Sequence, residues 1–403
     1  MSGDDATGRL SDGITEDIIT DLARFRDLDV IARNSTDAYK GKSTDIRQVG
    51  RELGVRYVLE GSVQRQGERI RVTAQLIDAA NGDHVWAERW DRPVGDVFAL
   101  QTELAEQVAN RLGGYAAVEQ AERTEAKRKR PENLSAYELY LLGTETAHRF
   151  TPQDSEVALQ VLRQAVEADP KLARAWTALA WANLISTNGA NDPAPLIQAA
   201  LGAGQRAMQL DPADAEAHAV VGEAQGLSGD LEQAKIQYEW ALSLNPGSAD
   251  ILTFYSGWAA DFGDPSAGME AADKAIRLDP NFPVWAASVY FAYAYFVGGR
   301  YDDSLKMVRR VPPENRSIRD FVIEAGSLAM LGRQQEARAA MEAALTHQPG
   351  LSAEEWAGSP MFSEATRQKF LEAMRRAEFP LCASPDLLRS KPELKRLPEC
   401  LAS

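Results

Sequence analysis

Two patterns of apolar and polar positions divide the chain near residue 113. Before that point, apolar residues at helical spacing, such as Ile14, Ile18 and Leu22, give way to short runs that read as β-strands. After about residue 134, helical spacing continues to about residue 350 and is interrupted at intervals by prolines. The pattern therefore predicts a small domain with mixed elements followed by a long all-helical region.

The first region, residues 1–113, has the predicted element order α-β-α-β-β-β-α. Gly54 is a helix C-cap in this interpretation, and Gly67 and Asn81-Gly82 form hairpin turns. The order predicts an α+β domain, a small mixed sheet with flanking helices. The predicted helices are 14–25, 45–53 and 96–112, and the predicted strands are 29–32, 56–64, 69–77 and 84–90.

Asx-Pro steps recur at a fixed period in the second region. The prolines of Asp211-Pro212, Asn245-Pro246 and Asp279-Pro280 are 34 residues apart. Such a period indicates stacked helical repeats, because one repeat is too small to bury its own apolar face. Residues 135–350 therefore predict an all-α solenoid of about six units, two of them degenerate, whose surface is suited to binding a partner.

Residues 215–248 carry the resemblance that identifies the repeat. Gly222, Ala234, Tyr238, Ala241 and Pro246 stand at positions 8, 20, 24, 27 and 32 of this unit. The region resembles the tetratricopeptide repeat, which has small, aromatic and proline residues at these positions. Small residues let two antiparallel helices approach closely, and the proline ends the second helix.

Repeat position assigns candidate partner-binding residues, because the first helices of stacked repeats line a groove in this family. The five candidates are Trp181, Glu223, Phe254, Tyr290 and Tyr293. One interpretation is a groove for a peptide or protein partner. The alternative is that the aromatic residues pack between repeats, as an aromatic stripe at helical spacing usually does.

Short motifs in the first region carry a second resemblance. They are SDGITEDII (11–19), VIARNS (30–35), YKGKS (39–43), LGVRYVLEGSV (53–63), AQLIDA (74–79) and HVWAERWD (84–91). Residues 1–112 resemble the TolB-like N-terminal domain that precedes tetratricopeptide repeats in many bacterial signalling proteins. This implies the C-terminal part of an adenylate/guanylate cyclase-like protein of class III. The family's usual first strand is missing, so we expect either a fragment or mis-started product, or a sheet with an unpaired edge.

Charge and cysteine content narrow the classes of partner and compartment. The net charge of −15 disfavours binding to the phosphate backbone of nucleic acids. Cys382 and Cys400 are the two cysteines, too few for a disulfide framework or a cysteine metal site. No apolar run is long enough to span a membrane, and the acidic N-terminus is unlike a signal peptide. We expect a cytoplasmic location, or a periplasmic one if a membrane anchor precedes the chain.

Candidate chemistry is sparse along the chain. No catalytic constellation is visible, and the sequence predicts neither a metal site nor a cofactor. Arg33, Lys40, Lys42 and Arg47 form a candidate weak anion site, with a plain polar loop as the alternative. Residues 114–134 are predicted to be a charged helical linker with a basic run at 127–130. Residues 351–379 are predicted to hold a capping helix, and the proline-rich residues 380–403 a loose tail.

These observations together predict a non-catalytic regulatory and protein-interaction module of a bacterial signalling protein. By resemblance, it is the C-terminal part of an adenylate/guanylate cyclase-like protein. The alternatives are a stand-alone tetratricopeptide adaptor for assembly or envelope processes, and the regulatory part of a transcription regulator. The sequence predicts neither the identity of the partner nor the oligomeric state.

Overall fold

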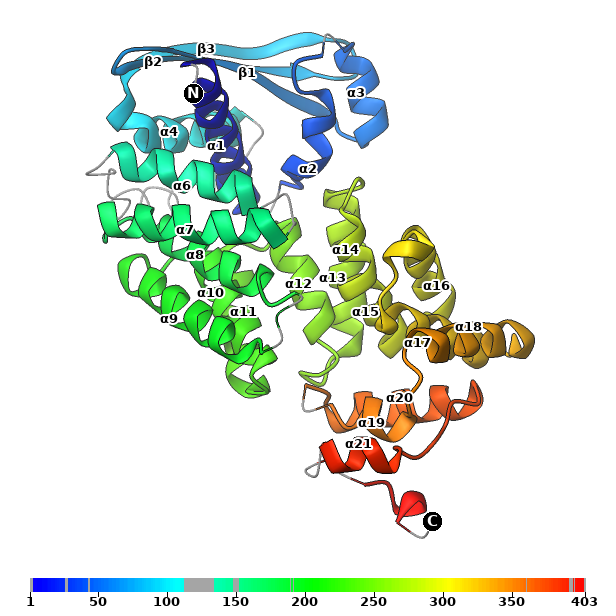
Figure 1. The fold of residues 1–403 in the computed structure, drawn as a ribbon. Helices are drawn as coiled ribbons and strands as arrows, with labels where there is room; N and C mark the ends of the chain where they lie inside the picture. The colour runs from blue at the N-terminus through cyan, green and yellow to red at the C-terminus, as the bar shows by residue number, and fades with distance from the viewer. Residues whose placement is uncertain are drawn as a thin grey trace. The chain divides into compact units, whose positions relative to one another are not determined.

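The computed structural model describes residues 3–25, 28–42, 44–111, 134–147, 152–188, 190, 192–359, 361–390, 394 and 396–401. The chain forms two compact units (Figure 1). Unit 1 comprises Met1–Ser228, Ile236–Ile251 and Arg277–Pro280, and unit 2 comprises Gly229–Lys235, Leu252–Ile276 and Asn281–Ser403. The predicted linker and its basic run lie outside the described residues, apart from residue 134.

The N-terminal block, residues 3–111, is a three-stranded antiparallel sheet with helices. Its strands have the order β1-β2-β3, and the register pairs Tyr57 with Asp78 and Val72 with Trp90. The elements are α1 (Gly3–Ala23), α2 (Arg33–Thr36), η1 (Asp37–Tyr39), α3 (Ile46–Leu53), β1 (Tyr57–Gln66), β2 (Arg69–Asp78), β3 (Asp83–Pro93), η2 (Val94–Asp96) and α4 (Val97–Arg111). Gly54 ends α3 in the left-handed conformation with φ 68°, which confirms the predicted cap.

Two details of the predicted sheet are wrong. Residues 29–32 are extended but form no strand, and the sheet is antiparallel throughout rather than mixed. The backbone N–H of Ala32 donates to the carbonyl of Leu278 at 2.7 Å. This apolar run therefore finds its hydrogen-bond partner in the repeat region and not in a neighbouring strand.

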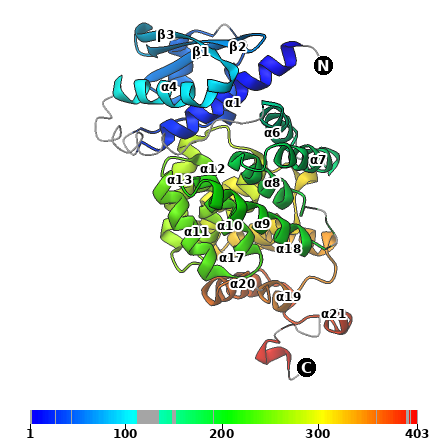
Figure 2. The same cartoon turned by 90° about the vertical axis from the view of Figure 1, so that its left-hand side faces the viewer.

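One face of the sheet is covered and the other is exposed. Ile70, Val72, Leu76, Trp86 and Trp90 are buried in a cluster shared with α1 and α4, which lie on the same side of the sheet (Figure 2). The opposite face carries polar pairs, among them the Arg71–Asp91 ion pair at 2.8 Å. This is the alternation expected for a half-buried antiparallel sheet.

The second region consists of successive helix pairs of the tetratricopeptide type, which confirms the predicted fold class. The pairs are α6 (Leu134–Ala147) with α7 (Pro152–Ala168), α8 (Ala173–Ile185) with α9 (Ala194–Leu210), α10 (Ala215–Leu227) with α11 (Leu231–Leu244), α12 (Ala249–Trp258) with α13 (Pro265–Leu278), the segment α14 (Val284–Ala286), η3 (Ala287–Phe291) and α15 (Ala292–Gly298) with α16 (Tyr301–Arg310), and α17 (Ile318–Met330) with α18 (Gln334–His347). Ala234, Tyr238 and Ala241 are fully buried, as the repeat pattern requires.

The C-terminal segment is bound to unit 2, although the sequence suggests a loose tail. Earlier in unit 2 lie η4 (Pro313–Asn315), α19 (Ala353–Ala357) and α20 (Glu364–Arg376). The C-terminal segment itself contains α21 (Pro385–Ser390) and η5 (Pro398–Cys400). The buried carboxylate of Glu354 accepts hydrogen bonds from the backbone N–H groups of Ala383 and Leu397 and from Arg396. Burial alone would raise the pKa of Glu354, but these donors lower it overall.

Cys382 and Cys400 form a disulfide with their Cα atoms 5.5 Å apart. The sequence predicts no disulfide framework, and the structure has this single crosslink between the two cysteines. The two cysteines can pair because residues 396–401 fold back onto Glu354. The number of cysteines in the sequence does not predict this contact.

Candidate functional site

The N-terminal block and the first repeat share one apolar core in unit 1. Tyr137 and Leu141 of α6 are buried in the same cluster as Leu10 and Ile14 of α1. A Cβ at Gly13 would lie 2.5 Å from a methyl group of Leu141, so α1 and α6 are in close contact there. The block is therefore packed on the repeats, although the sequence suggested a separate domain on a linker.

A partly buried ion pair lies beside this core. Asp17 of α1 accepts a hydrogen bond from the guanidinium of Arg174 on α8. The same guanidinium lies 4.9 Å from the ring centre of Phe98 on α4. Burial alone would lower the pKa of Arg174, but the carboxylate of Asp17 raises it overall. The two charges stabilise each other, and either one alone would be costly to bury.

The turns at Asn245-Pro246 and Asp279-Pro280 contact the N-terminal block directly. Asn245 is buried and donates from its side chain to the carbonyl of Thr20 at 3.3 Å. Two residues later, a Cβ at Gly247 would lie 2.4 Å from the carbonyl oxygen of Ala23. Glycine is therefore the residue that lets the end of α1 approach this turn.

The turn at Asp279 binds α2 through side-chain hydrogen bonds. The side chain of Asp279 accepts hydrogen bonds from the hydroxyl of the fully buried Ser35 and, at 3.4 Å, from the amide of Asn34. Asp169 and Asp211 instead accept from backbone N–H groups two residues on, at 3.0 Å. Those two follow the local Asx-turn pattern. We call the set of contacts from α1 and α2 to α6, to α8 and to the turns at 245–247 and 278–279 the seam.

An acidic group near the seam has a displaced pKa. Glu216, half-buried in the first turn of α10, accepts a hydrogen bond from Ser248 at 3.4 Å. Burial and the nearby carboxylates of Asp250, Asp214 and Glu16 raise the pKa of Glu216 to about 8. This part of unit 1 therefore becomes less stable as the carboxyl ionises.

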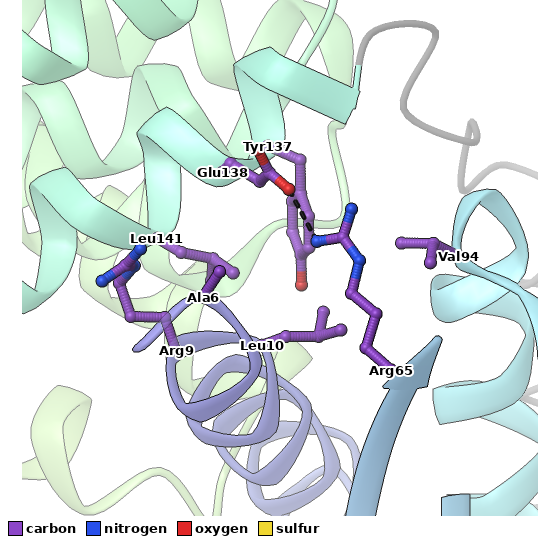
Figure 3. A pocket seen from close by; sticks show the side chains of 8 residues that line it. All are labelled: Ala6, Arg9, Leu10, Arg65, Val94, Tyr137, Glu138 and Leu141. Carbon is purple, nitrogen blue, oxygen red and sulfur yellow. Dashed lines mark hydrogen bonds and ion pairs between the residues drawn. The ribbon is translucent and has the colours of Figure 1, made fainter. Parts of the chain in front are cut away.

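A small pocket lies where α1 meets α6 (Figure 3). Ala6, Arg9 and Leu10 of α1 face Tyr137, Glu138 and Leu141 of α6, with Arg65 of β1 and Val94 beside them. Arg65 and Glu138 form an ion pair at 2.7 Å. The space inside this open pocket is about 10 Å³, which is the room of a single water molecule. This pocket is a packing feature of the seam and is too small for an organic ligand.

The five predicted partner-binding residues fall in two different units. In unit 1, Trp181 is half-buried against an apolar cluster, and Glu223 is buried and accepts a hydrogen bond from the hydroxyl of Tyr238. In unit 2, Tyr293 is buried and donates to Asp261 at 2.6 Å. Glu223 and Tyr293 therefore have packing partners inside their units.

Phe254 and Tyr290, the remaining two, are half-buried and lie together in unit 2. Their ring centres are 5.3 Å apart in an edge-to-face arrangement. Trp285, which the sequence reasoning missed, stacks on Phe254 at 6.0 Å and lies 5.9 Å from Tyr290. Trp285 is the second residue of the three-residue helix α14. Because this segment is short and irregular, the repeat pattern does not assign Trp285 a position in the groove.

The four residues of the predicted anion site are not gathered at one point. Arg33 pairs with Glu16 at 2.6 Å and with Asp12, which also binds Lys40. The Lys42 ammonium donates to the carbonyl of Ala38, and Arg47 pairs with Asp45. These cations hold α1, α2 and the following loop together, and an anion would have to compete with those partners.

No three or more His, Cys, Asp or Glu side chains among the described residues are grouped to hold a metal ion. None of the described helices is long and apolar enough to cross a membrane.

Comparison with known families gives one match inside the N-terminal block. Residues 5–107 match the family described as the second domain of HilA/YgeH-like transcriptional regulators. This description differs from the TolB-like resemblance of the motifs at 11–91, which stays a prediction.

A curated relative covers more of the chain. A protein of Rhizobium meliloti (strain 1021) named "Putative adenylate cyclase 3" is 42% identical over 238 residues. The match covers 58% of this chain and 40% of that protein. The chain thus spans about two fifths of the length of the relative it matches.

Solved structures similar to this chain are helical repeat proteins of low identity. Pseudomonas aeruginosa pilF is 18% identical, with 54% of this chain and 93% of that chain covered and a TM-score of 0.40. A tetratricopeptide repeat protein from Parabacteroides merdae is 16% identical, with 65% and 99% covered and a TM-score of 0.37. The fold assignment rests on the helix pairs and buried small residues of this chain and not on these superpositions.

Proposed function

We propose that this chain is a non-catalytic regulatory and protein-interaction module of a bacterial signalling protein of the adenylate/guanylate cyclase type. The observation that carries the proposal is the 42% identity with a protein named as an adenylate cyclase, of which the chain spans only a part. The tetratricopeptide-type helix pairs support the interaction role, since such arrays present extended binding surfaces. The TolB-like resemblance of the N-terminal block is typical of the same setting.

The seam suggests how such a module would pass on a binding event. It ties the N-terminal block to α6, α8 and two repeat turns through apolar packing, a partly buried ion pair and side-chain hydrogen bonds. A partner that binds the first repeats, where Trp181 is the candidate contact, and displaces them would therefore move the block with them. We propose Phe254 and Tyr290 as partner contacts, with Trp181 as a further candidate. Glu223 and Tyr293 have packing partners inside their own units.

The experiment has a catalytic arm and a binding arm. The full chain incubated with ATP or GTP and Mg²⁺ or Mn²⁺ should form no cyclic nucleotide, and measurable product would contradict the proposal. In the binding arm, the chain is applied to an immobilised peptide array, and the double variant Phe254→Ala/Tyr290→Ala should lose the retained peptides. Unchanged far-ultraviolet circular dichroism of that variant is the control for folding.

A second candidate is the regulatory part of a transcription regulator, which the match of residues 5–107 favours. The gene sequence directly upstream of Met1 separates the two candidates. A cyclase catalytic domain in frame supports the first candidate, and a DNA-binding domain supports the second. A stop codon close upstream would instead favour the stand-alone adaptor.

The Cys382–Cys400 disulfide bears on the compartment. Disulfides persist in oxidising compartments and are rare in the cytoplasm. The pairing therefore favours the periplasmic alternative over the cytoplasmic expectation. Maleimide labelling of the protein in cells quenched with acid measures this directly: unlabelled cysteines support the periplasm, and two labelled thiols support the cytoplasm.

A further inference from the structure

One face of α11 exposes two large apolar side chains in unit 1. Trp240 is 56% exposed, and Ile236, one helical turn before it, is 42% exposed. Residues four apart lie on the same side of a helix, so these two side chains are neighbours. Trp240 is also the only exposed aromatic side chain among the described residues. We call Ile236 and Trp240, with the exposed Ser243 on the next turn, the α11 face.

The ring of Trp240 is held in place by its neighbours. It stacks on His218 of α10, with 6.2 Å between the ring centres and 26° between the ring planes. His218 is buried, and its two ring nitrogens lie 2.7 Å from the side-chain oxygen of Gln237 and 3.2 Å from the carbonyl of Pro212. A side chain that is already ordered loses little conformational entropy when a partner covers it, which favours binding.

The helix beside this face carries almost no charge. α9 is packed on α10, since a Cβ at Gly204 would lie 2.7 Å from a methyl group of Val221, and it ends two residues before the Pro212 that contacts His218. α9, α10 and α11 lie side by side in both views (Figures 1 and 2). The exposed positions of α9 hold alanine, proline, glutamine and glycine.

A comparison with α7 shows how unusual this is within the chain. Both α7 and α9 are second helices of a pair and have 17 residues. α7 contains the charged residues Asp154, Glu156, Arg163 and Glu167, whereas α9 contains Arg206 alone. An uncharged surface therefore extends from the α11 face over α9.

The charge of the whole chain indicates which partner suits an uncharged surface. With a net charge of −15, two copies of the chain repel each other wherever their acidic groups meet. In a two-fold contact both copies use the same surface, so a charged residue near the axis would meet a like charge. A surface without charge is the place where two copies can meet without that repulsion, whereas a charged partner would gain no ion pair there.

We propose that two copies of this chain associate through the α11 face and the adjoining surface of α9, with Trp240 near the two-fold axis. The indole ring buries apolar area against Ile236 and Trp240 of the second copy, and tryptophan is enriched among the residues that dominate binding energy. This inference goes beyond the proposed function, because the partner contacts proposed above, Phe254 and Tyr290, lie in unit 2.

Sedimentation equilibrium of the full chain over a range of concentrations measures the association. Wild type should fit a monomer–dimer equilibrium. Trp240→Glu brings two carboxylates together and should weaken the dimer about thirtyfold, the effect of losing a dominant aromatic contact. Ile236→Glu should act in the same direction, which keeps the test valid if Trp240→Glu folds poorly. Added NaCl should strengthen wild-type association, because salt screens the repulsion between acidic copies.

Two controls separate this contact from general effects. Val157 on α7 is 48% exposed in the same unit, so Val157→Glu adds the same charge at a matched apolar site. It should change the dissociation constant of the dimer less than about twofold. Phe254→Ala/Tyr290→Ala should dimerise as wild type does, so loss of peptide binding and loss of the dimer are measured independently.

A mixture of two variants tests the two-fold arrangement. Trp240→Glu and Trp240→Lys should each associate weakly alone, because like charges meet at the axis. An equimolar mixture should form a mixed dimer about tenfold tighter than either variant forms by itself, because opposite charges then meet.

Four outcomes would overturn the inference. The first is a wild-type chain that stays monomeric up to its highest soluble concentration. The second is a dimer that Trp240→Glu and Ile236→Glu leave intact, which places the contact elsewhere. The third is a mixture of the Glu and Lys variants that associates no better than either alone, which excludes a two-fold contact at Trp240. The fourth is an association that salt weakens, which indicates ion pairs and not an uncharged surface.

Discussion

The seam of unit 1 and the aromatic cluster of Phe254, Trp285 and Tyr290 in unit 2 use the same repeat fold in different ways. In unit 1 the N-terminal block covers the turns at 245–247 and 278–279. Asn245 donates a hydrogen bond to the block, and Asp279 accepts one from it. In unit 2 the three aromatic rings stay half-buried. The difference is that the first repeats hold the N-terminal block through the seam, whereas Phe254 and Tyr290 of unit 2 are proposed as partner contacts.

The largest expected effect comes from Asp17→Asn, which breaks the ion pair of the seam. Arg174 would stay largely buried without its carboxylate, which costs about 3 kcal/mol in the free energy of unfolding. Urea unfolding followed by circular dichroism measures the loss. Glu372→Gln, which breaks the exposed pair with Arg376, is the matched control and should cost less than about 0.5 kcal/mol. Equal effects of the two variants would show that the seam pair is not buried in solution.

The disulfide of unit 2 should give the next effect. The pair Cys382→Ser/Cys400→Ser opens a loop with a sequence separation of 18, which costs about 3 kcal/mol in the chain-entropy account. Differential scanning calorimetry should show a lower transition for unit 2 and an unchanged one for unit 1. Dithiothreitol should shift the wild-type protein in the same way and leave the double variant unaffected. A shift of both transitions would contradict the separation into two units.

Gly247→Ala tests the close approach of the turn to the end of α1. The added methyl group would lie 2.4 Å from the carbonyl of Ala23, so the seam must open or shift at a cost of about 2 kcal/mol. Gly202→Ala in α9, where a Cβ meets nothing within 4 Å, is the matched control and should stabilise slightly. Limited proteolysis should release the N-terminal block from the Gly247 variant alone.

The last expected effect is a pH dependence at Glu216. Its pKa in the folded protein is raised to about 8, so between its unfolded pKa and 8 the folded state binds more protons than the unfolded state. The stabilising contribution of this group is therefore complete at acid pH and is lost as the pH rises through 8. Glu216→Gln should raise Tm at pH 9 relative to wild type, with little change at pH 4. Glu167→Gln, exposed on α7, controls for removal of one charge; the same Tm gain in both variants would contradict the role of burial.

The regular parts of this fold follow from local sequence. The left-handed backbone at the end of α3 favours glycine at position 54. Ala234 and Ala241 are small because two helices cross there, so each of these positions can be predicted from its own residue. The strand expected at 29–32 fails for a related reason: apolar content indicates burial, but a strand also needs a partner, and Ala32 finds Leu278 instead.

The turn residues of the seam are visible in the sequence, but the sequence does not predict their long-range partners. Asn245 and Asp279 look like ordinary turn residues, and their contacts with Thr20 and Ser35 join positions more than two hundred residues apart in the chain. Glu223 was assigned to a groove by repeat position, yet the hydroxyl of Tyr238 holds it in the interior. Such long-range pairing is decided by packing, which periodicity does not encode.

Hydrogen–deuterium exchange on the full chain tests most directly whether the N-terminal block and the first repeats fold as one unit through the seam. In wild type, the amides of α1 and of residues 245–250 and 277–280 should be protected together. Asp17→Asn and Gly247→Ala should lower that protection in all three segments and leave α17 and α20 unchanged. Loss of protection in α1 alone, with the turns unaffected, would contradict the seam.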